Sequence, residues 1–199
     1  MKKHFLILIA AGFFSFSNAQ DSKFYAGVGL GYATAGADVA DELDLSGGLN
    51  INFLNLGYRI NETWGVTANL SSSGHPIDDT DSAVGIGLFS IGPMISFPVG
   101  NMIWDFKPQY AFSAKGVIRG EDAQNSLLGD LEDVEFSGDA FIIGNSLVMG
   151  TSKGFSWSID FDYVFGKFNK VEGPGGSADI DEDNKFNNFK IGAGVRYNF

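Results

Sequence analysis

The sequence contains no cysteine, which excludes disulfide frameworks, zinc sites built on cysteine, thiol nucleophiles and lipid attachment to a cysteine. Histidine is scarce as well, and two residues leave few groups for acid–base chemistry near neutral pH. Positive charge is also limited, because 13 basic residues face 24 acidic ones and the formal net charge is −11. This balance disfavours binding to a polyanion, so we expect no nucleic-acid partner.

Long apolar runs are absent after the first twenty residues. Two lysines precede an apolar run over residues 5–14, and small residues occupy the −3 and −1 positions before Gln20. This arrangement predicts a secretory signal peptide over residues 1–19, which is removed. A membrane anchor is the competing interpretation, but the run is shorter than the ~20 residues that a spanning helix needs. Residues 20–199 then form one domain, which can cross a membrane only as a closed β-barrel.

Strict alternation of apolar and polar residues is the main structural signal of the remaining chain. In residues 155–165 every odd position is aromatic or isoleucine, whereas serine, aspartate and valine occupy the even ones. A strand places two such sets on opposite faces, whereas a helix would scatter them. The pattern recurs and predicts eight strands. We expect them at about residues 24–32, 46–60, 63–72, 83–97, 102–114, 136–150, 155–166 and 189–199.

Three of these segments alternate less cleanly. The apolar residues change parity near residue 53 in segment 46–60 and near residue 88 in segment 83–97. A β-bulge at each break would restore one continuous apolar face, and misjudged strand limits would explain the breaks equally well. In segment 136–150 the apolar face that we favour places Asn145 outward among apolar neighbours.

The connections between the expected strands alternate in length. Short ones lie at residues 61–62, 98–101 and 151–153, and long ones at about 34–45, 73–82, 115–135 and 169–185. Short turns at one end and long polar loops at the other are typical of outer-membrane barrels. The sequence therefore predicts an all-β fold, namely an eight-stranded antiparallel up-and-down transmembrane β-barrel with short periplasmic turns and long extracellular loops.

Large aromatic residues gather at the strand ends next to the short turns. A tryptophan on the outward parity follows each of the three turns, and other aromatic residues end the neighbouring strands at the same level. Amphipathic aromatic rings prefer the interface between lipid and water. We therefore predict a periplasmic aromatic girdle, which comprises Tyr58, Trp64, Phe97, Trp104 and Trp157.

The leader, the eight alternating strands and the closing segment 194–199 together resemble the small OmpX-like and OmpA-barrel-like outer-membrane β-barrel proteins of Gram-negative bacteria. The resemblance covers residues 20–199 and implies a location in the outer membrane. It also implies that Tyr197 and Phe199 form an assembly signal, which the outer-membrane barrel insertion machinery reads as a partner. Proteins of this family differ in function, so the resemblance implies no particular activity.

Seven charged side chains fall on inward positions of the expected strands. The lumen of an eight-stranded barrel is just wide enough for its own side chains, so we expect opposite charges to pair across it as a structural plug. A narrow proton or ion path is the functional alternative, and the pairing depends on the strand register. The expected lumen charge network comprises Arg59, Asp105, Lys107, Asp160, Asp162, Lys190 and Arg196.

His75 is the only histidine after the leader, and it lies close to serines at 71–73 and aspartates at 78, 79 and 81. A serine activated by histidine and oriented by a carboxylate would suit a lipid-modifying enzyme. No recognisable active-site signature follows His75, so we favour a plain loop histidine and expect no catalytic residue.

Acidic residues concentrate in the four expected long loops, which hold 18 of the 24. Such carboxylates could bind divalent cations that also bridge lipopolysaccharide phosphates, although we favour simple solvation. Residues 179–190 begin like a calcium loop but lack its glycine and its final glutamate. We therefore expect no metal site and no cofactor.

The sequence favours a non-enzymatic, monomeric outer-membrane protein that contacts the lipid bilayer and lipopolysaccharide. Its expected role is envelope integrity or surface interaction through acidic loops. The alternatives are a small porin-like pore, a lipid-modifying outer-membrane enzyme and a soluble calycin-type binder with an apolar pocket.

Overall fold

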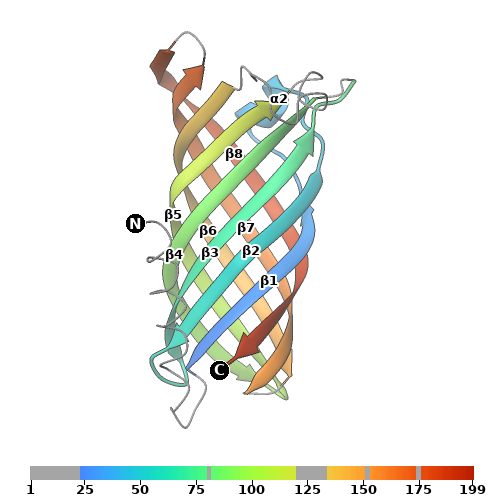
Figure 1. Ribbon diagram of the computed structural model, residues 1–199, viewed down its shortest axis with the longest axis vertical. Coiled ribbons are helices and arrows are strands. Elements are labelled where there is room, and N and C mark those ends of the chain that lie inside the picture. Colours follow the sequence, from blue (N-terminus) through green and yellow to red (C-terminus); the bar gives the residue numbers. More distant parts are fainter. Residues whose placement is uncertain (1–22, 80–81, 120–133, 151–152, 174–175) are drawn as a thin grey trace, which may run out of the picture.

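The computed structural model describes residues 23–79, 82–119, 134–150, 153–173 and 176–199, which form one closed antiparallel β-barrel. Its eight strands follow one another in chain order around the wall, and the first pairs with the last (Figure 1). The predicted fold class is confirmed, whereas the leader over 1–19 lies outside the described residues. The strands are β1 (Phe24–Ala33), β2 (Gly48–Arg59), β3 (Trp64–Pro76), β4 (Ala83–Val99), β5 (Met102–Arg119), β6 (Val134–Gly150), β7 (Gly154–Gly173) and β8 (Gly176–Asn198).

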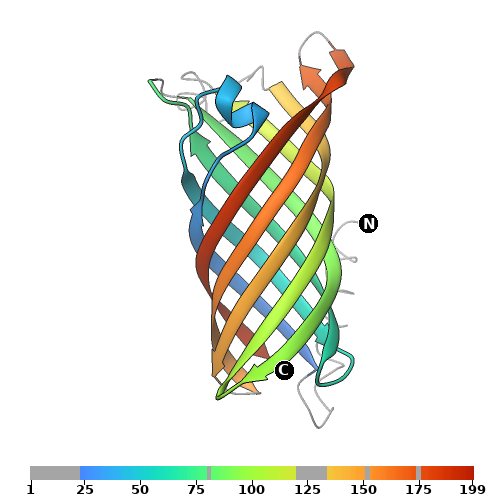
Figure 2. The ribbon, with the colours of Figure 1, turned by 180° about the vertical axis from the view of Figure 1, so that it is seen from behind.

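The barrel has two different ends. The start of β1 and the end of β8 lie at one end, which we call the terminal end, and the opposite end is the mouth (Figures 1 and 2). Strands continue toward the mouth well beyond the expected limits: β3 runs to Pro76, and β7 and β8 pair as far as Gly173 and Gly176. The expected long loops over 73–82, 115–135 and 169–185 are therefore too long, because backbone pairing continues through polar segments that lack apolar alternation.

The first loop, between β1 and β2, contains the short helix α2 (Asp38–Glu42). Two isolated β-bridges fix this loop to the mouth, one from Gly36 to Asn187 and one from Leu45 to Ile77. Within the described ranges, no helix is long and apolar enough to cross a membrane.

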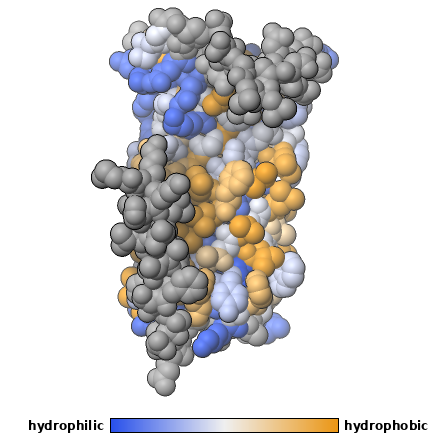
Figure 3. Space-filling model, viewed as in Figure 1, coloured by the Kyte–Doolittle hydropathy of each residue, from blue (hydrophilic) through white to orange (hydrophobic). Residues whose placement is uncertain are grey.

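The outward side chains of the strands form an apolar surface. Figure 3 shows apolar residues across the middle of the visible face and polar residues toward its ends. The bulge predicted near residue 53 is confirmed, because the register shifts between Asn52 and Leu54, and Phe53 and Leu54 both face outward. The bulge predicted near residue 88 is wrong, because β4 alternates regularly there. The register shift lies instead in its partner β5, at Phe112.

The seam between β1 and β8 closes the barrel through glycines on its inner face. Gly27, Gly29 and Gly31 point inward from β1, and Gly192 and Gly194 do so from β8. A Cβ atom on Gly31 would lie 2.2 Å from the carbonyl oxygen of Ile191 and 2.6 Å from the Cα of Gly192. The two strands approach so closely here that a side chain would have to push the backbones apart.

Candidate functional site

A cluster of charges surrounds one carboxylate in the lumen near the terminal end. Asp105 is fully buried, and Arg196 and Arg59 approach its two oxygens at 2.8 and 3.3 Å. Ser96 donates a hydrogen bond of 2.6 Å to the same carboxylate, and the Arg196 guanidinium lies 4.4 Å from the ring centre of Tyr25. Charge-assisted hydrogen bonds from three strands therefore hold Asp105 and block the lumen at this level.

A second pair of charges lies deeper in the lumen. The Nζ of Lys107 is 3.8 Å from a carboxylate oxygen of Asp160, which also accepts hydrogen bonds from Ser146 and Ser158. The two remaining members of the predicted charge network are arranged differently. Asp162 and Lys190 face each other in the register of β7 and β8, but no ion pair within 4.0 Å joins them in the described part of the chain.

The half of the lumen nearer the mouth is filled by apolar side chains, which we call the apolar plug. Its two largest rings, Phe168 and Phe186, stack with their centres 4.6 Å apart. Sequence reasoning missed this plug because it assumed that apolar residues face outward. One feature of the sequence could have revealed the plug. The apolar residues at 84, 86 and 88 occupy even positions, like Ser90, whose polar side chain indicates the inward face. The plug comprises Val84, Ile86, Leu88, Ala111, Ala114, Ala140, Ile142, Val164, Phe168 and Phe186.

The first loop covers the mouth above the apolar plug, and we call residues 34–47 the lid. Val39, Leu43 and Leu45 of the lid pack against the plug, and Ala40 in α2 is buried. Figure 2 shows α2 at the mouth beside β8. The described lumen is thus closed at three levels, by the lid, by the plug and by the charge cluster around Asp105.

The prediction that His75 is a loop residue is wrong. His75 lies on the inner face of β3 and is fully buried. Its Nε2 is 2.9 Å from the hydroxyl of Ser73 and 3.1 Å from the amide nitrogen of Asn188, and its Nδ1 is 3.2 Å from the carbonyl oxygen of Ser46 in the lid. A serine and a histidine therefore do meet, but Ser73 is also fully buried and faces the lumen instead of the lipid. This geometry favours a structural role, in which His75 ties the lid to the wall.

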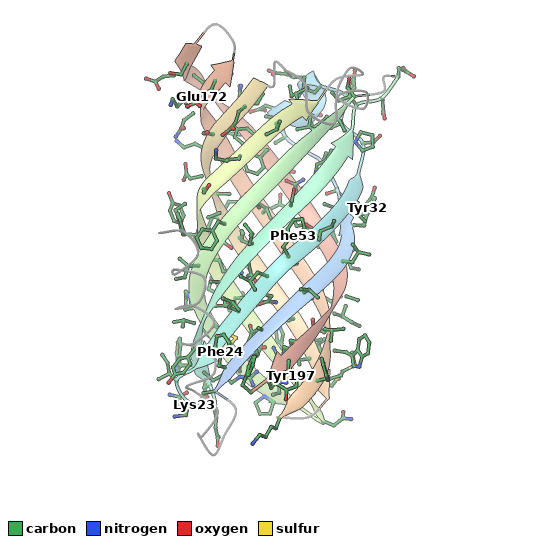
Figure 4. All side chains as sticks on the ribbon, in the orientation of Figure 1. Lys23, Phe24, Tyr32, Phe53, Glu172 and Tyr197 are labelled. Carbon is green, nitrogen blue, oxygen red and sulfur yellow. The ribbon has the colours of Figure 1, made fainter. Side chains whose placement is uncertain are left out.

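The aromatic residues expected in the girdle all point outward, with exposed fractions between 40% and 63%. The indole nitrogen of Trp104 donates a hydrogen bond of 3.1 Å to the side chain of Asn145, which explains the polar residue on that apolar face. Tyr197 and Phe199 also point outward at the terminal end, with ring centres 5.1 Å apart, and Phe24 lies 5.4 Å from Phe199. Figure 4 shows Phe24 and Tyr197 at this end.

Comparisons with known proteins agree with this architecture. The family model described as the outer membrane protein beta-barrel domain matches residues 6–199. The crystal structure of Neisserial surface protein A is similar over 91% of this chain and 100% of that one, with a TM-score of 0.60 and 14% identity. The structure of Ail, the attachment invasion locus protein of Yersinia pestis, is similar over 89% of this chain and 100% of that one, with a TM-score of 0.51 and 14% identity.

At this identity both likenesses concern the fold, and no functionally curated protein matches the sequence. Together with the closed eight-stranded barrel, the family match shows that the chain belongs to the outer-membrane β-barrel proteins and resides in the outer membrane of a Gram-negative bacterium.

Proposed function

We propose that this protein is a non-enzymatic, non-conducting barrel that acts through its extracellular surface, in envelope integrity or surface interaction. The observation that carries the proposal is the filled lumen. Eight strands enclose a space that side chains can fill, and here the lid, the apolar plug and the charge cluster around Asp105 fill it at successive levels. A solute would have to displace all three to pass.

The surface available for interaction is the acidic mouth. In the described part of the lid Asp38, Asp41, Glu42 and Asp44 are exposed, and Asp78 and Asp79 lie beside them after β3. Within the described residues, no three acidic or histidine side chains converge as a metal site. We therefore propose that the mouth acts through its summed negative charge, toward a cationic partner or through diffuse counter-ions shared with lipopolysaccharide.

Electrical recording tests the proposal directly. The whole purified protein, inserted into planar bilayers as a monomer, should give no steady open level under conditions in which a general porin conducts. A stable single-channel current would overturn the proposal in favour of the porin-like alternative. The enzymatic alternative is tested separately: mass analysis of membrane lipids should give the same profile with wild type, with His75→Ala and without the protein.

We further propose that Tyr197 and Phe199 are read by the insertion machinery before the barrel closes. Phe199 contributes to final stability only as an interfacial side chain, on the order of 1–2 kcal/mol. Deletion of Phe199 should therefore lower the folded amount in outer membranes far more than it lowers the stability of barrel refolded in detergent. An equal loss in both assays would mean that Phe199 serves only in packing.

A further inference from the structure

A small chamber lies at the inner side of the β1–β8 seam, beside β2 and β7. Its volume is about 20 Å³. The glycines at the β1–β8 seam leave this space, because they contribute no side chains to the lumen beside β2 and β7. Among the residues that line it, Asn50, Asp160, Asp162 and Lys190 face the lumen, whereas Leu30 and Ala193 of the seam belong to the outer face.

Three buried polar atoms at this chamber have no hydrogen-bond partner among the described residues. They are the Nζ of Lys190, one carboxylate oxygen of Asp162 and the side-chain oxygen of Asn50. Lys190 is only 4% exposed and Asn50 only 9%. A buried ammonium or carboxylate without a partner is strongly unfavourable, so these atoms together require a ligand that satisfies both donors and acceptors.

We propose that one ordered water molecule is a permanent ligand of this chamber. A buried water needs roughly 10–15 Å³ of space and makes about three hydrogen bonds, and the chamber supplies both. The water accepts a hydrogen bond from the Nζ of Lys190 and donates one each to Asp162 and Asn50. It thereby links the Nζ of Lys190 in β8 to the one oxygen of Asp162 in β7 that lacks a partner among the described residues.

The charges around the chamber discriminate against ions. A metal cation there would meet the ammonium of Lys190 at close range, and an anion would meet the carboxylates of Asp160 and Asp162, so each would face repulsion in a medium of low dielectric. A neutral molecule that both donates and accepts fits the set of partners. The volume also excludes an organic solute.

A crystal structure of the whole protein at high resolution tests this inference, with parallel soaks in bromide and rubidium as anomalous scatterers. The expected result is a single peak without anomalous signal, at hydrogen-bonding distance from Lys190 and Asp162. An anomalous peak in the chamber would overturn the inference in favour of an ion. Direct contact between Lys190 and Asp162 with no peak between them would also overturn it.

A pair of variants sharpens the test. Asn50→Leu removes one acceptor and fills part of the chamber, so the water peak should be lost. Asn55→Leu is the matched control, because Asn55 also faces the lumen from β2 but does not line the chamber, and the peak should remain. Persistence of the peak in Asn50→Leu, or its loss in Asn55→Leu, would contradict the assigned partners.

Discussion

The two halves of the lumen are closed by different kinds of interaction. Near the terminal end, buried ion pairs join different strands, and each charge depends on a particular partner at a particular distance. Toward the mouth, apolar side chains fill the space and depend on volume instead of on pairing. A buried charge whose partner is removed is strongly destabilising, whereas apolar packing tolerates exchange among residues of similar size. The lumen therefore has two halves of different character. We call the half around Asp105 the selective half and the half that holds the apolar plug the tolerant half.

The largest effect is expected in the selective half. Asp105→Ala leaves Arg59 and Arg196 without their shared carboxylate, and loss of one partner of a buried ion pair costs roughly 3–5 kcal/mol. Urea unfolding of the barrel in lipid vesicles measures the change in the free energy of unfolding. Asp139→Ala is the control, because Asp139 accepts a hydrogen bond from Tyr110 on the outer face and should matter much less. Equal losses in both variants would remove the distinction between inner and outer carboxylates.

The tolerant half should respond in proportion to volume. Ile86→Ala in the apolar plug should lower the free energy of unfolding by about 3 kcal/mol through a new cavity, and Ile86→Val by about 1 kcal/mol. The same unfolding assay applies to both variants. If the conservative Ile86→Val cost as much as Ile86→Ala, the plug would be as selective as the charged half.

The outer face of the wall supplies a third comparison. Ile159 faces lipid two residues from Trp157, and an arginine there should destabilise the barrel by about 2 kcal/mol, at the low end of the range for the bilayer middle. Ile159→Met retains an apolar side chain and should unfold at nearly the same urea concentration as wild type. Normal stability of Ile159→Arg in vesicles would show that this face does not contact lipid.

The smallest effect is expected at the girdle. Trp104→Phe keeps an aromatic ring but removes the hydrogen bond to Asn145, which should lower the free energy of unfolding by about 1 kcal/mol. Asn145→Leu in the Trp104→Phe background should then cost little more, because the partner is already lost. A large additional loss would mean that Asn145 stabilises the wall in another way.

The sequence was sufficient for the strand number, the barrel and the outward parity, because a strand with one face on lipid must alternate strictly. The sequence was not sufficient for the strand ends that extend beyond the lipid-facing band. Residues such as Lys170 and Asp179 pair in strands without any apolar alternation, so the ends of β7 and β8 resembled a loop. The bulge at Phe53 was visible as a change of parity. The bulge at Phe112 was not, because the residues that follow it, Ser113 to Gly116, show no apolar alternation in which a change of parity could appear.

The site could be predicted only in part for a related reason. Inward charges stand out among serines and glycines, so all seven candidates were visible, but their partners depend on the register between distant strands. The apolar plug was hidden, because an inward leucine such as Leu88 resembles a lipid-facing one when the strand is considered alone. The contacts of His75 join residues of the lid, β3 and β8, and their separation in sequence conceals them.

The glycine seam between β1 and β8 has a consequence for the evolution of this protein. At Gly31 every other amino acid would bring a Cβ atom within 2.2 Å of a backbone oxygen, so a single substitution cannot be accommodated by a change of rotamer. The neighbouring strand would have to shift, and with it the pairing that closes the barrel. Among descendants of this chain we therefore expect the loops at the mouth to diverge freely, while inherited variation at the seam is purged.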